Sequence, residues 1–349
     1  MCGIAGYIGE SKNPNLTYRL ATRLFERIES RGTDASGFYG SEGDTIHHHK
    51  QTLRSAHYVK TEPWRNLGGK NCNMLIAHAR GASVGDPQDN RNSHPFLNKE
   101  KTLALVHNGT LTTAEYKNLL KRYEVESACD SEILMRIIIG SDAAAAAVKY
   151  PDEKPDVAAR LLGLKDLFSV INHGHMAAAV AENTPGEKRL WLFRNEHRPL
   201  WVADVRDSLG QVFFCSTPEI WTSAVNATHD LRRLPGFSKH KLYNLTPQEV
   251  WMFTLADDLQ YRRFSVSQDT PVPWKHDGTK VALDCKPTPT SELAVVLANL
   301  RESLDFIEQA CGDIEQENSL TPQGYSELVN GLGMVDQDLL AVRQGLEKR

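Results

Sequence analysis

The order in which apolar patterns follow one another constrains the fold of this chain more than any other feature. Residues 3–8, 74–79 and 103–107 are short apolar runs typical of buried strands. Residues ~113–162 instead carry mainly helical patterns, and strand-like runs return from ~168 to 264. Strands, then helices, then strands again predict an α+β fold, in which helix layers cover stacked, mainly antiparallel sheets.

The positions of individual elements follow from the same periodicities. Leucine or isoleucine recurs at positions 16, 20, 24 and 28, which predicts a helix over residues 15–30. Further helices are expected at 113–122, 131–139, 142–149 and 156–162. Besides the three runs above, strands are expected at 37–40, 45–50, 168–172, 176–181, 189–194, 200–204, 211–216 and 249–255, with a hairpin-like turn at 183–186.

Composition and charge are those of an ordinary soluble protein. The 349 residues suffice for one large or two ordinary domains, with 40% hydrophobic and 24% charged residues. The formal net charge of −4 and the scattered basic residues predict no binding to nucleic acid. No apolar stretch reaches the ~18 residues of a membrane span, and no signal peptide is recognisable, so we expect a cytoplasmic protein without membrane contact.

Neither the cysteines nor the histidines form a recognisable metal site. The six cysteines, at positions 2, 72, 129, 215, 285 and 311, include no Cys-x-x-Cys pair. His47, His48 and His49 are adjacent, so on a strand they point to alternate faces, and no cysteine or acid cluster completes a site. We therefore interpret them as a solvated strand end, and expect neither a metal nor a cofactor.

The chain changes character after residue 265. Residues 266–290 hold four prolines among polar residues, which is typical of a linker or extended wrap. Residues 291–349 carry two heptad-like seams, which predict a helical hairpin that either packs on its own domain or serves self-association or partner docking. The seams are Leu293, Leu297, Leu300, Leu304, Ile307 and Cys311, then Leu328, Leu332, Val335, Leu339, Val342 and Leu346.

The chain starts Met1-Cys2-Gly3, and this start has a chemical consequence. Removal of Met1, for which a small second residue is suited, would leave Cys2 with a free α-amino group. Such a residue combines a nucleophilic thiol with an amine that titrates near ~8 and relays the proton. An arbitrary small residue at position 2 is the alternative, and Cys2 alone does not exclude it.

Four further segments accompany Cys2. They are Arg31-Gly32-Thr33-Asp34-Ala35-Ser36-Gly37, then Ala77-His78-Ala79-Arg80-Gly81-Ala82-Ser83-Val84-Gly85 with Ser93-His94-Pro95-Phe96, then Val106-His107-Asn108-Gly109-Thr110-Leu111, then Cys129-Asp130-Ser131-Glu132. In this order and with these gaps, residues 2–265 resemble the glutaminase domain of class II glutamine amidotransferases. The resemblance implies a four-layer αββα sandwich of the N-terminal-nucleophile hydrolase type.

The resemblance also implies a catalytic role for four residues. Cys2 would form a γ-glutamyl thioester and release ammonia. Asn108 and Gly109 would donate hydrogen bonds to the developing oxyanion, and Arg31 would hold the N-terminal loop and its carbonyls.

The candidate substrate-binding residues are Arg80, Asp130, Ser83 and His107. The planar guanidinium of Arg80 would grip the α-carboxylate of glutamine, and Asp130 would pair with its α-ammonium, so that a free amino acid is selected. Because the mechanism has its own base, we also interpret His107, like the other two histidines of these segments, as a structural hydrogen-bonding residue.

Each motif residue also has an ordinary structural interpretation. Asn108-Gly109 is a common turn dipeptide, Asp130 is suited to the start of a helix, and Arg80 would serve in a surface ion pair. Each of these is reasonable singly, but all of them together, in register with Cys2, are improbable.

One departure from the family pattern concerns the residue after Arg80. The synthase-type members usually carry an aromatic residue there, whereas this chain has Gly81 followed by Ala82-Ser83-Val84. The missing aromatic favours the smaller stand-alone members of the family, and it leaves open how the pocket closes on glutamine.

The residues after ~265 are too few for a fused synthase domain, and they contain no P-loop or pyrophosphate-loop signature. We therefore expect a glutaminase subunit that hydrolyses L-glutamine and passes ammonia to a separate synthase. Two alternatives stay open: an amidase acting on another γ-glutamyl compound or acyl amide, and an inactive scaffold that binds a partner through residues 291–349.

Overall fold

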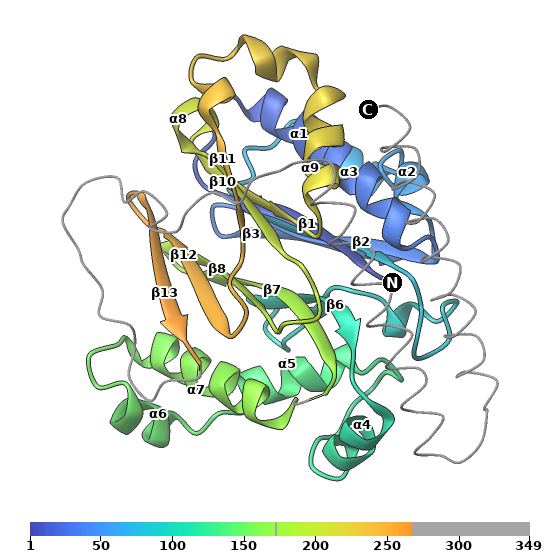
Figure 1. Cartoon of the computed structure of the whole chain (residues 1–349), viewed down its shortest axis with the longest axis vertical. Coiled ribbons are helices and arrows are strands. Elements are labelled where there is room, and N and C mark those ends of the chain that lie inside the picture. Colours follow the sequence, from blue (N-terminus) through green and yellow to red (C-terminus); the bar gives the residue numbers. More distant parts are fainter. Residues whose placement is uncertain (172, 267–349) are drawn as a thin grey trace, which may run out of the picture.

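The computed structural model describes residues 1–171 and 173–266. Within them two antiparallel sheets lie face to face, and helices cover the outer face of each sheet (Figure 1). This arrangement is the predicted four-layer αββα sandwich. The predicted hairpin at 291–349, and all of the predicted linker except residue 266, lie outside the described residues.

The first sheet contains the start of the chain. Its strands are β1 (Gly3–Ile8), β2 (Ala35–Glu42), β3 (Thr45–Gln51), β4 (Met74–Arg80), β9 (Trp201–Val205), β10 (Gln211–Cys215) and β11 (Lys241–Asn244). Their order in space is β11-β9-β10-β1-β4-β2-β3, and neighbouring strands are antiparallel. Because β1 is enclosed between β10 and β4, the N-terminus is held in the middle of the sheet.

The second sheet faces the first. Its strands are β5 (Phe96–Leu97), β6 (Leu103–Thr110), β7 (His175–Thr184), β8 (Glu187–Arg194), β12 (Glu249–Leu255) and β13 (Leu259–Ser265). They lie in the order β13-β12-β8-β7-β6-β5, again antiparallel. The tip of the β7–β8 hairpin has Gly186 at φ 74°, a left-handed conformation that glycine adopts readily and that matches the predicted turn.

The helices form the two outer layers. On the first sheet lie α1 (Pro14–Arg27), α2 (Ser55–Tyr58), α3 (Glu62–Arg65) and α9 (Pro218–Asn226). On the side of the second sheet lie α4 (Thr113–Leu120), α5 (Ser131–Ile139), α6 (Ala143–Lys149) and α7 (Pro155–Val170). The remaining helical turns are η1 (Ile28–Arg31), η2 (Asn90–Asn92), α8 (Arg206–Leu209), η3 (His229–Arg233) and η4 (Phe237–Lys239).

Local sequence explains where the longer helices begin. The Asn13 side chain accepts the backbone N–H of Leu16 at the start of α1, and Pro14 occupies its first position. Thr112 and Glu115 form a reciprocal capping box at the start of α4. These bonds satisfy backbone donors that a helix start otherwise leaves without partners.

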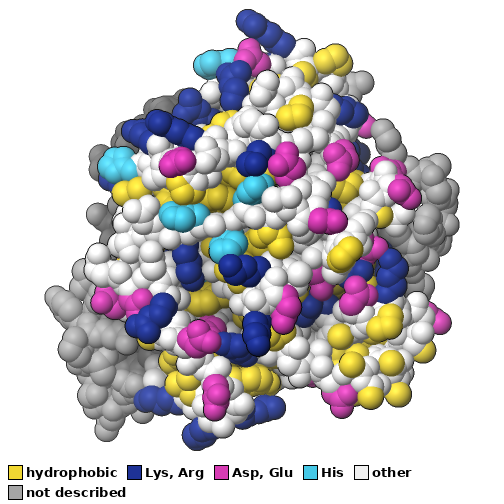
Figure 2. All heavy atoms as spheres, turned by 180° about the vertical axis from the view of Figure 1, so that it is seen from behind, with side chains coloured by type: hydrophobic (Ala, Val, Ile, Leu, Met, Phe, Trp, Pro, Cys, Tyr) yellow, Lys and Arg dark blue, Asp and Glu magenta, His cyan; other side chains and the backbone are white. Residues whose placement is uncertain are grey.

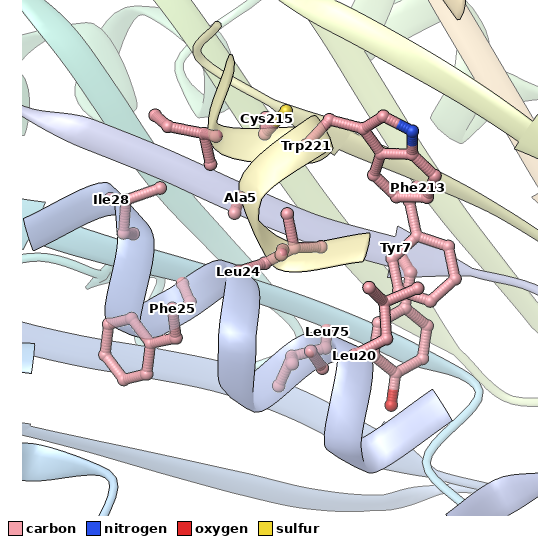
Figure 3. Packing of buried hydrophobic residues seen from close by; sticks show 14 of the residues in the cluster. Ala5, Tyr7, Leu20, Leu24, Phe25, Ile28, Leu75, Phe213, Cys215 and Trp221 are labelled. Atoms are coloured by element: carbon pink, nitrogen blue, oxygen red, sulfur yellow. The ribbon is translucent and has the colours of Figure 1, made fainter. Parts of the chain in front are cut away.

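Three apolar clusters join the four layers. Along β1, Ala5 and Tyr7 face the helices, whereas Ile4 and Ile8 face the second sheet, as the alternation of side chains on a strand requires. Figure 3 shows the outer cluster, in which Leu24 of α1 lies with Ala5 and Tyr7. A second outer cluster packs α5 and α7 on the other sheet. Both faces of each sheet are therefore buried, which is why many strands read as continuous apolar runs.

Most of the predicted elements are present. The strand predicted at 168–172 is wrong, because residues 168–170 complete α7, whose buried Leu161, Leu164 and Leu167 continue at helical spacing. The short strand β11, the partly polar strand β13 and helix α9 were not predicted. The three adjacent histidines lie in the middle of the edge strand β3 and not at a strand end, with His48 exposed.

The surface carries charges of both signs. Figure 2 shows the face behind that of Figure 1, where acidic and basic side chains are interspersed. No helix within residues 1–171 and 173–266 combines the length and the apolar character needed to cross a bilayer.

Candidate active site

Strand ends from both sheets meet at one edge of the sandwich. In the first sheet, β1 and β2 both begin beside the end of β4. In the second sheet, β6 ends beside the start of β7. A hydrogen bond of 3.0 Å from Nε2 of His78 to the carbonyl oxygen of His107 joins the two sheets here. Motif residues that are far apart in the sequence are thus brought to one place.

Several of these side chains point into the layer between the sheets. Because side chains alternate along a strand, Asn108 of β6 lies on the same side as Val106. Cys2 directly precedes β1, and the same alternation, continued by one residue, places it on the side of Ile4. Ile4 and Val106 belong to the apolar cluster between the sheets, and His78 reaches across the same layer to β6. This layer is therefore apolar over most of its length and polar at the edge that holds Cys2, His78 and Asn108, which we call the polar end.

Cys2 is nearly buried, and hydrogen bonds hold both its thiol and its backbone carbonyl. Its Sγ donates to the carbonyl oxygen of Gly81 at 3.5 Å, and Nε of Arg31 donates to the carbonyl oxygen of Cys2 at 3.0 Å. Two residues later, the backbone N–H of Ile4 donates to Oγ of Ser216 at 2.9 Å. A thiol held in this way has a defined position, which a nucleophile needs for reaction with a bound substrate.

Asn108 and Gly109 lie at the end of β6. The Asn108 side chain is 1% exposed, and neither its amide nitrogen nor its amide oxygen has a hydrogen-bond partner among the described residues. Since buried polar atoms nearly always have a partner, this amide is suited to bind a ligand. A Cβ on Gly109 would lie 1.8 Å from the carbonyl oxygen of His175, so only glycine fits at this position.

Arg80 is buried at the end of β4 and holds the loop that follows it. Its guanidinium donates to the carbonyl oxygens of residues 84, 85 and 86 at 2.6, 3.0 and 3.4 Å. In the same loop, Oγ of Ser83 lies 3.1 Å from Oγ1 of Thr110, so the loop bridges β4 and β6. A substrate carboxylate would have to replace one or more of these carbonyls at Arg80. Carboxylate binding by Arg80 and substrate binding by Ser83 therefore stay predictions.

Asp130 and His107 connect α5 to the end of β6. Asp130 immediately precedes α5, as predicted, but its Oδ2 accepts the backbone N–H of Leu111 at 2.8 Å and makes no capping bond to the helix. Nδ1 of His107 lies 2.8 Å from Oγ of Ser131, and Nε2 of His107 donates to the carbonyl oxygen of His175 at 3.3 Å. The His107 ring thus points to α5 and away from the inter-sheet layer, which favours its interpretation as a structural residue.

Burial keeps the histidines of this region neutral. His78 and His94 are both buried, and their rings stack with centroids 3.9 Å apart. Burial lowers the pKa of His78 to about 3 and places the pKa of His94 well below its usual value. The pKa of His107 is also lowered, chiefly by burial. Near pH 7 these imidazoles hold positions and do not carry a proton in and out of the site.

Comparison with known proteins identifies the domain. No family model matches the chain. Over 141 residues the chain is 35% identical to the glutamine–fructose-6-phosphate aminotransferase (isomerizing) of Clostridium perfringens, and over 144 residues it is 33% identical to that of Chlorobaculum tepidum. Among solved structures, one described as the allosteric regulatory enzyme of purine biosynthesis aligns with a TM-score of 0.51 and 20% identity, over 76% of this chain and 49% of that chain. The chain contains a class II glutamine amidotransferase domain.

The likeness to the solved structure shows a shared fold, so the amidotransferase domain has the N-terminal-nucleophile hydrolase architecture. The sequence matches cover 40% of this chain and 22% of each relative. The chain therefore spans about a fifth of the length of these curated relatives.

Three positioning residues of the amidotransferase domain were not predicted. Oδ2 of Asp34 accepts the backbone N–H of Ala82 at 2.8 Å and so holds the loop after Arg80. Ser131 contacts His107, and Ser216 bonds the backbone two residues after Cys2. Asp34 and Ser131 lie inside the sequence motifs, so their place in those motifs could have identified them. Ser216 has no such signal, because only the pairing of β1 with β10 brings it near.

Proposed function

We propose that the amidotransferase domain hydrolyses L-glutamine to glutamate and ammonia, with Cys2 as the nucleophile once Met1 has been removed. The observation that carries the proposal is the buried Asn108 amide, which has no partner among the described residues and faces the same layer as Cys2. An oxyanion is stabilised by donors that are held in place before the reaction begins. The curated relatives are glutamine–fructose-6-phosphate aminotransferases, which supports glutamine as the substrate.

The reaction would proceed in two steps. The α-amine of Cys2, titrating near ~8, takes the thiol proton while the sulfur attacks the γ-carbonyl carbon. The Asn108 amide and the Gly109 backbone N–H stabilise the oxyanion, and the α-ammonium returns the proton to the departing nitrogen as the C–N bond breaks. Water then hydrolyses the thioester, which releases glutamate and restores the thiol.

Arg80 and Asp130 would select the amino-acid end of glutamine. Both are buried at the same edge as Cys2, with 2% and 3% of their surface exposed. Arg80 would bind the α-carboxylate and Asp130 the α-ammonium. Because residues 84–86 now occupy the Arg80 guanidinium, we expect this loop to move when glutamine binds, and Ser83 to move with it.

We also propose that a separate synthase uses the ammonia. The supporting observation is in the sequence, where Gly81 follows Arg80 in place of the aromatic residue that synthase-type members usually carry. Residues 291–349 are our candidate for docking that synthase or a second copy of the chain. Deletion of 291–349 should then change the oligomeric state or abolish co-purification with the synthase, and a deletion that changes neither would contradict the docking proposal.

The test of the hydrolytic function uses the full chain, with intact mass showing that Met1 is absent. Glutamate and ammonia release from L-glutamine are measured for the wild type, Cys2→Ala and Cys72→Ala. We expect Cys2→Ala to abolish turnover and Cys72→Ala to retain it, because Cys72 is another buried cysteine but lies before the start of β4, at the opposite end of that strand from Arg80. Ammonia release that survives in Cys2→Ala would overturn the proposal. A wild type with Met1 removed and no turnover would instead support the inactive-scaffold alternative.

A further inference from the structure

Lys50, near the end of the edge strand β3, binds two backbone carbonyls of a distant segment. Its Nζ donates to the carbonyl oxygens of Ser93 at 2.5 Å and Pro95 at 3.4 Å, and it lies 4.9 Å from the centroid of the Phe96 ring. Burial lowers the pKa of Lys50 to about 8, so near pH 7 the ammonium keeps its charge and its three donors. Hydrogen bonds from a charged donor are strong, so Lys50 is suited to fix the segment that carries the two carbonyls.

The segment that Lys50 binds lies tightly on the first sheet. Lys50 pairs with Gly37 of β2, and Gly37 pairs in turn with His78 of β4. A Cβ on Gly37 would lie 2.2 Å from the carbonyl oxygen of His94 and 2.8 Å from Cβ of Lys50. Non-bonded heavy atoms prefer separations of about 3.5–4 Å, so only glycine leaves room for the His94 backbone here. This backbone therefore lies over β2, with Lys50 on one side and His78 on the other.

The ring of His94 has no hydrogen bond of its own to hold it. His94 is 2% exposed, and neither of its ring nitrogens has a partner among the described residues. The ring is therefore positioned by its stack on His78 and by its own backbone. Because Lys50 binds the carbonyl oxygens of the residues immediately before and after His94, the position of the His94 ring depends on Lys50.

His78 connects this arrangement to the second sheet. Its Nε2 donates to the carbonyl oxygen of His107, and the next residue of β6 is Asn108. The buried Asn108 amide has no hydrogen-bond partner among residues 1–171 and 173–266, so no bond to the amide itself fixes its direction. That direction depends on the backbone of β6, which His78 contacts.

We propose that Lys50 is a positioning residue of the amidotransferase domain, which sets the Asn108 amide through His94 and His78. Lys50 does not touch the substrate; it fixes the donor that faces the oxyanion. The inference rests on the proposed function, in which Asn108 is that donor. Lys50 lies outside the sequence motifs, and only the pairing of β3 with β2 and the path of residues 93–95 bring it into this arrangement.

The first test measures glutamine turnover by the full chain with Met1 removed. Lys50→Met keeps an apolar stem but removes the donors, so kcat should fall by about 10-fold and KM should stay within about 2-fold of the wild type, because a small displacement of a catalytic group slows the reaction. Lys50→Arg supplies donors again and should return kcat to within about 3-fold of the wild-type value. Lys60→Met is the matched control, because Lys60 is exposed, and both of its kinetic constants should match the wild type.

A double-variant cycle separates positioning of Asn108 from a general effect on folding. If Lys50 acts through Asn108, its substitution has little left to affect once the amide is gone. In the Asn108→Ala background, Lys50→Met should therefore lower kcat by less than about 2-fold. The inference is wrong if the whole loss of about 10-fold persists in that background, or if Lys50→Met raises KM at unchanged kcat. Circular dichroism checks that each variant is folded.

The second test does not depend on turnover. NMR records the side-chain amide signals of protein made with isotope-labelled asparagine, and Asn108→Ala identifies the Asn108 signal. We expect Lys50→Met to shift this signal and Lys60→Met to leave it in place. An unshifted signal in folded Lys50→Met contradicts the inference, whether or not glutamine is hydrolysed. If the signal shifts but the wild type hydrolyses no glutamine, the proposed function is wrong and the positioning of Asn108 by Lys50 stands.

Discussion

The two ends of the inter-sheet layer are built from the same kind of strands but hold different chemistry. At the apolar end, Ile8, Leu190 and Phe253 belong to the cluster that joins the sheets. At the polar end, Cys2 and Asn108 face the same layer. The alternation of side chains is identical at both ends, so the difference lies only in which residue types occupy the inward positions.

The difference teaches how the fold tolerates a reactive site. Each large apolar side chain buried at the apolar end contributes about 1.5–3 kcal/mol to stability. An unpartnered buried polar group such as the Asn108 amide instead costs about 1–3 kcal/mol. Packing elsewhere in the layer therefore offsets the polar end. Mutations at the apolar end should lower stability, whereas mutations at the polar end should lower activity.

The largest effect on stability is expected at the apolar end. Phe253 is fully buried, and its ring centroid lies 5.1 Å from that of Tyr261. Phe253→Ala should lower the free energy of unfolding by about 3–5 kcal/mol, because it removes apolar contacts and leaves a cavity. Urea unfolding followed by circular dichroism measures this loss. A variant with wild-type stability would show that the apolar end does not support the fold.

Two residues on one strand provide the sharpest contrast in activity. Asn108→Ala should lower kcat by about 10²–10³, as the loss of an oxyanion donor does, while stability stays near the wild-type value. Val106→Ala, two positions earlier and also buried, should lower the free energy of unfolding by about 2 kcal/mol and leave kcat of the folded protein unchanged. Glutamine turnover and urea unfolding are measured for both. The comparison fails if Val106→Ala reduces kcat as much as Asn108→Ala.

A smaller effect is expected where His107 ties β6 to α5. His107→Ala removes the contacts with Ser131 and the carbonyl of His175, so it should shift Asn108 and lower kcat by about 10-fold. His107→Asn can replace the Nδ1 contact and should recover part of the loss. If KM rises and kcat does not change, His107 acts on substrate binding instead, as the alternative sequence interpretation held.

A last effect, spread over several pH units, is a pH dependence that comes from the polar end. The pKa of His78 is about 3 in the folded protein, below the unperturbed value of about 6.5, and the pKa of His94 is shifted in the same direction. Below about pH 6.5 the unfolded chain therefore binds protons that the folded chain does not. Stability is fully present above that pH and falls as the pH is lowered, by about 1.4 kcal/mol per pH unit for each such histidine.

Thermal unfolding between about pH 7.5 and about pH 5 measures this slope. His94→Leu should reduce the slope, because it removes one buried imidazole. His173→Gln is the control, since His173 is exposed, and its slope should match the wild type. An unchanged slope in His94→Leu would contradict the assignment of the pH dependence to the polar end.

Much of the fold was predictable because most strands are buried on both faces and therefore appear as apolar runs. The error at residues 168–172 arose because a short apolar run fits a strand or a helix end equally well. Strand β13 alternates with polar residues at a sheet edge and left only a weak pattern. The site residues were predictable as motifs. That His107 points to α5 and Asn108 into the inter-sheet layer became known only from the position of β6 between its neighbours.

The sequence by itself determined the alternation of sheet and helix segments, the nucleophile candidate at position 2 and the set of polar residues that accompany it. Only the tertiary structure decided how these residues meet. The bonds of Arg80 to its own loop, the unpartnered Asn108 amide and the bond from the Ile4 backbone to Ser216 each depend on how separate segments of the chain pack. Local patterns record which face of an element is buried, but they do not record which distant segment lies against it.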